Sequence, residues 1–337
     1  MSPSTTVDPL TNTRLSPFEG LAPEILQTIT GFLPLSSACS LAFRSRTVNQ
    51  RIGTRSWTRL RSQRQERDIF LILLGQDMPD YILCYHCKVL HKPSKMGTPC
   101  RKDRVWIDGL PLTFASFQQV MKSYHAGRNV QSTLDAFSGI STKLLRSYTY
   151  QHVSEARIVA GNLLIRSQHW VIVPLGQPTI FPPDARMFLC SHLVHNPNNR
   201  DRGHKRLELF AQCRIRHRDE PKGCNLIACG TIKNCFYCDT EFQFDVKDFP
   251  GHGTAIIITS WRNFGAGEHP ADPKWRAQSR LGLDLRACSK EHGFHVGLMS
   301  SQFENGKKPA LEASILSREE GRVMTRSLRS GLLSYVA

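Results

Sequence analysis

The segment Leu21-Ala22-Pro23-Glu24-Ile25-Leu26 opens a stretch, 21–60, that decides the fold of the N-terminal part of the chain. Pro23 has a φ angle suited to the first turn of a helix, and the Glu24 carboxylate favours the positive end of the helix dipole. Apolar side chains then recur at helical spacing, at Ile25, Leu26, Ile29, Phe32 and Leu33. Because Pro34 cannot continue a helix, we expect this first helix to end there.

Two more short helices are expected before residue 60. Ser36 or Ser37 can cap the second helix. Its apolar face comprises Ala38, Leu41 and Ala42. Val48 and Ile52 are four residues apart and indicate a third helix, which Gly53 ends. Three helices of this length cannot bury all these apolar side chains, so either the rest of the chain or a partner must cover them.

The order and spacing of these residues resemble an F-box, the helical module that docks on the Skp-type adaptor of SCF ubiquitin ligases. The resemblance is carried by Leu21, Pro23, Glu24, Ile25, Leu26, Ile29, Phe32, Leu33, Pro34, Leu35, Leu41, Val48 and Trp57. Two features depart from the family pattern. Ala22 stands where the family usually has proline, and arginines such as Arg44 and Arg46 occupy a part usually written with a Cys-Lys or Ser-Arg pair. The alternative is an ordinary core-forming helical hairpin.

The resemblance implies a set of adaptor-docking residues. They are Leu21, Pro23, Ile25, Leu26, Ile29, Leu33, Pro34 and Leu41. Some of these side chains must face the small core of the module itself, and the sequence does not separate the two groups. Through the adaptor, the resemblance also implies a cullin as an indirect partner and an unknown protein as the substrate.

Composition narrows the remaining function classes. Forty-four basic and twenty-eight acidic residues among 337 give a formal net charge of +16, which favours acidic partners. The basic residues are spread along the chain without a basic-aromatic signature, so nucleic-acid binding is not favoured. No apolar run reaches the length of a membrane span, and residues 1–16 lack the features of a secretory signal. We therefore expect a protein of the cytoplasm or nucleus with reduced cysteines.

The chain divides by composition into five segments with an α+β fold. We expect a disordered lead-in at 1–16, the F-box at 17–62, a helical and cysteine-containing region at 63–147, a β-rich domain at 148–305 and a tail at 306–337. One helix is predicted from Trp57 to Leu74, buried over its apolar second half. Another is predicted from Leu112 to Tyr124, whereas 129–145 is ambiguous.

Short apolar runs separated by turn residues predict an antiparallel sheet in the second half of the chain. Gly161-Asn162 is the predicted turn of a hairpin, and residues 265–275 are predicted to form a loop. The runs are Ile158–Ala160, Leu163–Ile165, His169–Val173, Met187–Leu193, Leu207–Ile215, Leu226–Thr231, Phe242–Val246 and Thr254–Trp261.

Two CxxC pairs are candidates for metal sites. They are Cys84-Tyr85-His86-Cys87 and Cys235-Phe236-Tyr237-Cys238, and a two-residue spacer can turn both sulfur atoms toward one tetrahedral zinc ion. His91 and Cys100 can complete a local site at the first pair. The alternative is that the cysteines are small core residues. A redox CxxC is not favoured because neither pair opens a helix in a βαβ unit.

The second CxxC pair has two candidate sets of completing ligands. Cys224 and Cys229 precede it directly, and Cys190 and His192 lie on an earlier predicted strand. A third arrangement joins the two CxxC pairs in one four-thiolate site. The sequence does not choose among the three.

No motif in the sequence names a catalytic nucleophile together with its base, so we expect no intrinsic enzyme activity. Segments around both CxxC pairs resemble filamentous-fungal F-box proteins of poorly defined function, over about residues 17–280. The resemblance implies a substrate-receptor subunit of an SCF-type ubiquitin ligase. The alternatives are an F-box scaffold outside any ligase and a zinc-stabilised nucleic-acid-binding protein.

Overall fold

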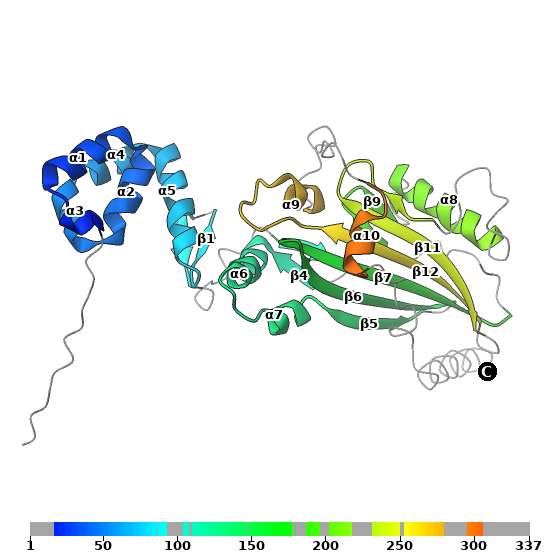
Figure 1. The fold of residues 1–337 in the computed structure, drawn as a ribbon. Helices are drawn as coiled ribbons and strands as arrows, with labels where there is room; N and C mark the ends of the chain where they lie inside the picture. Colours follow the sequence, from blue (N-terminus) through cyan, green and yellow to red (C-terminus); the bar gives the residue numbers. More distant parts are fainter. Residues whose placement is uncertain are drawn as a thin grey trace, which may run out of the picture. The chain divides into compact units, whose positions relative to one another are not determined.

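The computed structural model describes residues 17–85, 87–92, 104–107, 110–145, 147–176, 179, 187–195, 202–217, 231–249, 253–279 and 295–305. The chain forms two compact units, Met1–Met96 and Gly97–Ala337, and each is treated by itself below (Figure 1). The predicted lead-in at 1–16 and the predicted tail at 306–337 lie outside the described residues, and the predicted domain boundaries stay predictions. None of the described helices is long and apolar enough to cross a membrane.

The first unit consists of short helices followed by a small hairpin. The elements are a 3₁₀ turn η1 (Pro17–Gly20), helices α1 (Pro23–Phe32), α2 (Leu35–Arg44), α3 (Arg46–Ile52), α4 (Arg55–Ser62) and α5 (Arg64–Asp77), and strands β1 (Ile82–Cys84) and β2 (Val89–His91). The predicted ends of the first and third helices are confirmed. Helix α1 ends at Phe32 before Pro34, and Gly53 ends α3 with a left-handed φ of 80°.

The predicted cap of α2 is wrong. Helix α2 begins at Leu35, directly after Pro34, and its N-terminus has no side-chain cap. The backbone N–H of Ser36 instead donates to the carboxylate of Glu66 at 2.8 Å. A carboxylate from another helix therefore accepts from the N-terminal backbone of α2, where we had predicted a serine side chain as the acceptor.

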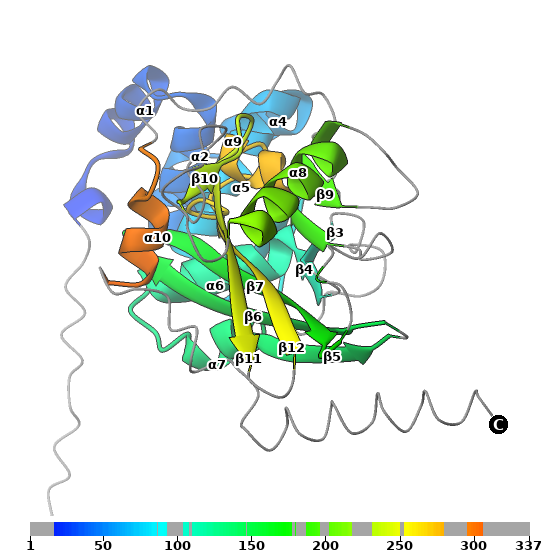
Figure 2. The ribbon, with the colours of Figure 1, turned by 90° about the vertical axis from the view of Figure 1, so that its right-hand side faces the viewer.

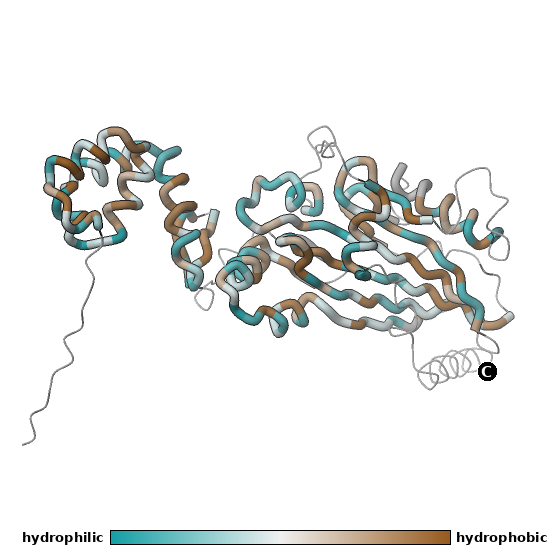
Figure 3. Tube along the Cα trace, in the orientation of Figure 1, coloured by the Kyte–Doolittle hydropathy of each residue, from teal (hydrophilic) through white to brown (hydrophobic). Residues whose placement is uncertain are grey.

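The single helix predicted from Trp57 to Leu74 is also wrong. The chain breaks at Gln63, which is extended with φ −102° and ψ 94°, and this break lets α4 and α5 each pack against α2. The apolar run 69–74 is not buried on all sides either. Only Phe70 in it is fully buried, and Ile69 is 39% exposed. Figure 3 shows the change from hydrophilic to hydrophobic residues along α5.

Trp57 joins the two small hydrophobic clusters of the first unit. One cluster comprises Leu26, Ala42, Val48 and Ile52, and the other comprises Cys39, Leu60 and Phe70. The Trp57 ring packs against both clusters and meets the Phe70 ring edge-on, with centroids 5.5 Å apart. Its indole N–H donates to Asn49 at 2.8 Å, so the ring is fixed at both its apolar and its polar end.

The second unit is built on one antiparallel sheet, which confirms the predicted α+β class. Its strands lie in the order β10, β11, β12, β7, β6, β5 (Figures 1 and 2). The strands are β5 (Gly139–Leu144), β6 (Thr149–Val159), β7 (Asn162–Pro174), β10 (Lys233–Asn234), β11 (Thr240–Phe249) and β12 (Gly253–Asn263). The turn between β6 and β7 is Ala160-Gly161, one residue earlier than predicted, with φ angles of 47° and 73°. Asn162 already belongs to β7.

The segment Leu207–Ile215, predicted as a strand, lies in helix α8 (Arg202–Arg216). Leu207, Phe210 and Ala211 are buried against the sheet, and their spacing of three and four residues is that of a helix face. Other apolar residues lie between these three, so the helical spacing of the buried residues was not evident from the sequence. The predicted strand Leu226–Thr231 lies almost wholly outside the described residues.

The other predicted elements are mostly confirmed, but a turn at Ser191-His192 divides the predicted run Met187–Leu193 into two strands, β8 (Met187–Cys190) and β9 (Leu193–His195). The predicted helix Leu112–Tyr124 is α6 (Phe114–His125), which is capped by Thr113 and preceded by the two-stranded pair β3 (Arg104–Ile107) and β4 (Leu110–Thr113). The ambiguous segment holds α7 (Gln131–Asp135) and strand β5. The predicted loop ends in helix α9 (Pro273–Gln278), whose Trp275 stacks on Phe117 of α6 with centroids 5.2 Å apart.

Helix α10 (Leu298–Phe303) is attached to the sheet by buried charged groups, on the face opposite to α8. Glu241, fully buried on β11, accepts hydrogen bonds from the backbone N–H groups of Gly297 and Ser300 at 2.7 and 2.8 Å. Glu304 pairs with Arg166 at 3.1 Å and accepts from the indole of Trp261 at 3.0 Å. Glu241 thus satisfies backbone N–H groups at the start of α10, and Glu304 pairs the Arg166 guanidinium, which would otherwise lack a buried countercharge.

Replacement of Glu304 by glutamine should lower the free energy of unfolding by about 3 kcal/mol, because it leaves Arg166 buried with half of its countercharge. Urea unfolding of the full chain measures this loss. Asp135→Asn, at an exposed carboxylate on α7, is the matched control and should change stability by less than about 0.5 kcal/mol. Equal losses in the two variants would contradict the role given to the ion pair.

Candidate metal centre

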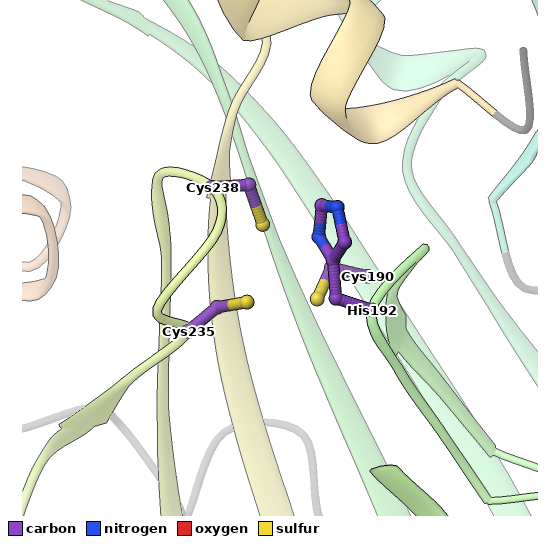
Figure 4. A group of neighbouring side chains, drawn as sticks. All are labelled: Cys190, His192, Cys235 and Cys238. Atoms are coloured by element: carbon purple, nitrogen blue, oxygen red, sulfur yellow. The ribbon is translucent and has the colours of Figure 1, made fainter. Parts of the chain in front are cut away.

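Four potential metal ligands come together at one end of the large sheet of the second unit. Cys190 is the last residue of β8 (Met187–Cys190), and His192 lies in the turn to β9 (Leu193–His195). Cys235 and Cys238 lie in the turn between β10 and β11. One ligand atom from each of the four residues lies within 4.8 Å of every other. Their side chains point toward one another across the gap between the two turns (Figure 4).

The three sulfur atoms of this tetrad are shielded from solvent. Cys190, Cys235 and Cys238 are all buried, and His192 is half-buried. The N–H of Tyr237 donates to the Cys235 sulfur at 3.4 Å, and the Thr240 hydroxyl lies 3.2 Å from the Cys238 sulfur. Contacts of this kind fix the orientation of ligands around a metal ion.

The hydrogen bonds of Ser191 fix the tautomer of His192. The single hydroxyl proton of Ser191 is donated to the carbonyl oxygen of Ala277 at 2.5 Å. The same hydroxyl oxygen must therefore accept the hydrogen bond that joins it to Nδ1 of His192, 3.4 Å away. This places the imidazole proton on Nδ1. The other ring nitrogen, Nε2, is buried. It keeps the lone pair that a metal ion needs.

Burial and mutual hydrogen bonding push the pKa values of the three thiols apart. Burial raises the pKa of Cys190 and of Cys238, because it disfavours a desolvated thiolate. Hydrogen bonds from the Cys190 and Cys238 thiols lower the pKa of Cys235, because they stabilise its thiolate. A cation at the centre would remove this conflict, since it stabilises all three thiolates at once.

The structure brings together one of the three ligand arrangements that the sequence left open. The Cys235/Cys238 pair meets Cys190 and His192 within the second unit. Cys224 and Cys229 lie outside the described residues. If a metal ion binds, three thiolates and one imidazole would fill all four tetrahedral positions with protein ligands, which is the arrangement of a structural rather than a catalytic site.

The first CxxC pair forms a separate cluster in the first unit. Ligand atoms of Cys84, Cys87 and His91 lie within 4.8 Å of one another, and predicted Cys100 lies outside the described residues. Cys84 is buried, whereas Cys87 is exposed and His91 is half-buried.

The structure separates the predicted adaptor-docking residues into inward and outward groups. Leu26 is fully buried, and Leu21 and Leu41 pack against the same cluster. Pro23, Ile25, Leu33 and Pro34 are exposed, and Ile29 is half-buried.

Sequence reasoning missed two outward residues, Phe32 and Phe43, with exposed fractions of 86% and 55%. The signal for Phe43 was present, since Ala38 and Ala42 define the inner face of α2 and Phe43 falls outside it.

No protein-family model matches this chain, and neither a curated protein nor a solved structure shows significant similarity to it.

Cys238→Ser should lower the metal content of the purified protein by one equivalent, because it removes one of four ligands. Elemental analysis by mass spectrometry measures this content. At free metal 100-fold above its dissociation constant, bound metal adds about 2.7 kcal/mol to the free energy of unfolding, so a chelator should lower the melting temperature of the second unit.

Cys213→Ser is the matched control, since Cys213 on α8 lies outside both clusters. It should leave the metal content unchanged. A Cys238→Ser variant with full metal content would refute the tetrad.

Proposed function

We propose that the chain is an F-box protein that acts as the substrate-receptor subunit of an SCF-type ubiquitin ligase. The proposal rests on the motif at 21–60 together with one observation, the apolar residues that its helices leave exposed. The protein itself would perform no chemistry. It would hold a substrate near the ubiquitin-loaded enzyme that the cullin arm recruits, so its contribution is proximity.

The apolar residues that α1 leaves exposed or half-buried follow one face of the helix. Ile25, Ile29 and Phe32 are separated by four and three residues, so they share a stripe of the helix. Leu26, next to Ile25, points into the core instead. Leu33 and Pro34 extend the stripe beyond the end of α1, and both are exposed. Exposed apolar side chains that gather along one face of a small helical module are typical of a site that a partner covers.

We further propose that the Cys190/His192/Cys235/Cys238 tetrad holds zinc. Thiolate and imidazole ligands at tetrahedral spacing favour zinc over the harder ions magnesium and calcium. The ion would join the β8–β9 turn to the β10–β11 turn. Its role would be to fix the surface of the receptor unit, which is consistent with a binding protein rather than an enzyme.

A second candidate function is polyanion binding, and one observation favours it. Five exposed arginines lie on α4 and the first turn of α5, and none forms an ion pair among the described residues. They are Arg55, Arg59, Arg61, Arg64 and Arg67. Retention on a heparin column that falls steeply between low and moderate salt would support this function, because phosphate and sulfate binding is salt-dependent.

The double variant Ile25→Asp with Leu33→Asp should weaken the affinity for a Skp-type adaptor by at least 100-fold, because two charges would be buried in an apolar interface. Both side chains are exposed, so the variant should keep its circular dichroism and melting temperature. Isothermal titration with purified adaptor measures the affinity.

The matched control is Gln50→Asp with Thr58→Asp, which adds the same charge at exposed polar positions on α3 and α4. It should bind the adaptor within threefold of the unmodified protein. Adaptor binding that survives in the folded Ile25/Leu33 variant would eliminate the docking face. Leu26→Asp cannot serve this purpose, because Leu26 lies in the core and its loss would unfold the module.

A further inference from the structure

We propose that the β1–β2 hairpin of the first unit binds a second zinc ion through Cys84, Cys87 and His91. We further propose that this ion is released from the protein far faster than the ion of the tetrad. The inference does not depend on adaptor binding. It rests on the geometry of the hairpin and on the difference in burial between the two clusters.

The backbone of the hairpin presents the three ligands to one point. Cys84 ends β1 and is paired with Val89 of β2, and Ile82 is paired with His91. The N–H of Lys88 donates to the carbonyl oxygen of Cys84 at 2.8 Å, and Lys88 itself has a left-handed φ of 56°. This tight turn is costly for a residue with a Cβ atom, and it brings Cys87 back over the start of the hairpin.

The distances within the cluster fit a metal ion after a small adjustment. The Cys87 sulfur lies 2.8 Å from Nε2 of His91, which is closer than two ligands of one metal ion lie to each other. Ligands of a tetrahedral zinc ion lie about 3.5–3.8 Å apart, given bonds of about 2.3 Å to sulfur and 2.0 Å to nitrogen. Binding of zinc between them would therefore require the Cys87 sulfur and Nε2 of His91 to move apart by less than about 1 Å.

The two clusters differ in the access that they give to solvent. In the tetrad, three buried thiols and an imidazole surround the centre. In the hairpin, Cys87 is exposed, His91 is half-buried, and the described residues supply three ligands. Water or a chelator can approach an ion held in this way, so we expect faster release from the hairpin.

The ion would stabilise a hairpin that is too small to be stable by itself. Each strand has three residues, and a two-stranded hairpin of this size is marginal in water. The hairpin contacts α5, where the ammonium group of Lys88 pairs with Asp68 at 2.9 Å. A bound ion would fix the turn that carries Lys88 and so strengthen this attachment.

Metal content and release kinetics of the full chain test the proposal. The unmodified protein should contain two zinc equivalents, and a colorimetric chelator should remove one at least tenfold faster than the other. Cys87→Ser should contain one equivalent and lose the fast phase, whereas Cys238→Ser should lose the slow phase. Cys213→Ser, as control, should keep both phases.

His91→Ala provides a second variant, with His125→Ala as its control at an exposed histidine on α6. The first should lose the fast phase and the second should keep it. The proposal is overturned by a single equivalent in the unmodified protein that Cys87→Ser leaves unchanged, or by a fast phase that persists in both Cys87→Ser and His91→Ala. Adaptor affinity, measured separately, distinguishes either result from failure of the docking face.

Discussion

A module of short helices has room for only a small core, and this limit divides the apolar residues of the first unit into two groups. Leu26, Val48 and Ile52 fill the space that Trp57 closes. Ile25, Phe32 and Leu33 have no place in that space and stay exposed, although the motif contains them as regularly as it contains the core residues. The proposed function depends on this division, because residues that stabilise no core of their own are available to a partner.

The second unit meets a different constraint, because the three thiols of its tetrad would repel one another if all of them were ionised. Three buried thiols cannot all ionise without a cation, and the raised pKa values of Cys190 and Cys238 express that cost. The β8–β9 turn and the β10–β11 turn come from distant parts of the sequence, and the four side chains meet where these turns approach each other (Figure 4). A metal ion at the centre would account for both the arrangement and the chemistry of the four side chains.

Local patterns in the sequence predicted much of the fold. Helical spacing after Pro23 placed α1, and the apolar runs around residue 170 and residue 258 placed β7 and β12. The errors arose where tertiary contacts decide. The break at Gln63 allows both α4 and α5 to pack against α2. The α8 segment resembles a strand in sequence, because its buried residues can be told from its other apolar residues only in the folded unit.

Of the candidate sites, the sequence indicated each CxxC pair from its spacing but not the ligands that complete it. Cys190 and His192 are more than forty residues from Cys235, and only the packing of the β8–β9 pair against the large sheet places them together. The division of the docking residues likewise needed the orientation of each helix.

The most direct measurement for the central claim is co-purification of the tagged full chain with a Skp-type adaptor and a cullin, with the eluate identified by mass spectrometry. The account predicts adaptor in stoichiometric amount together with cullin. A folded protein that recovers neither would contradict it.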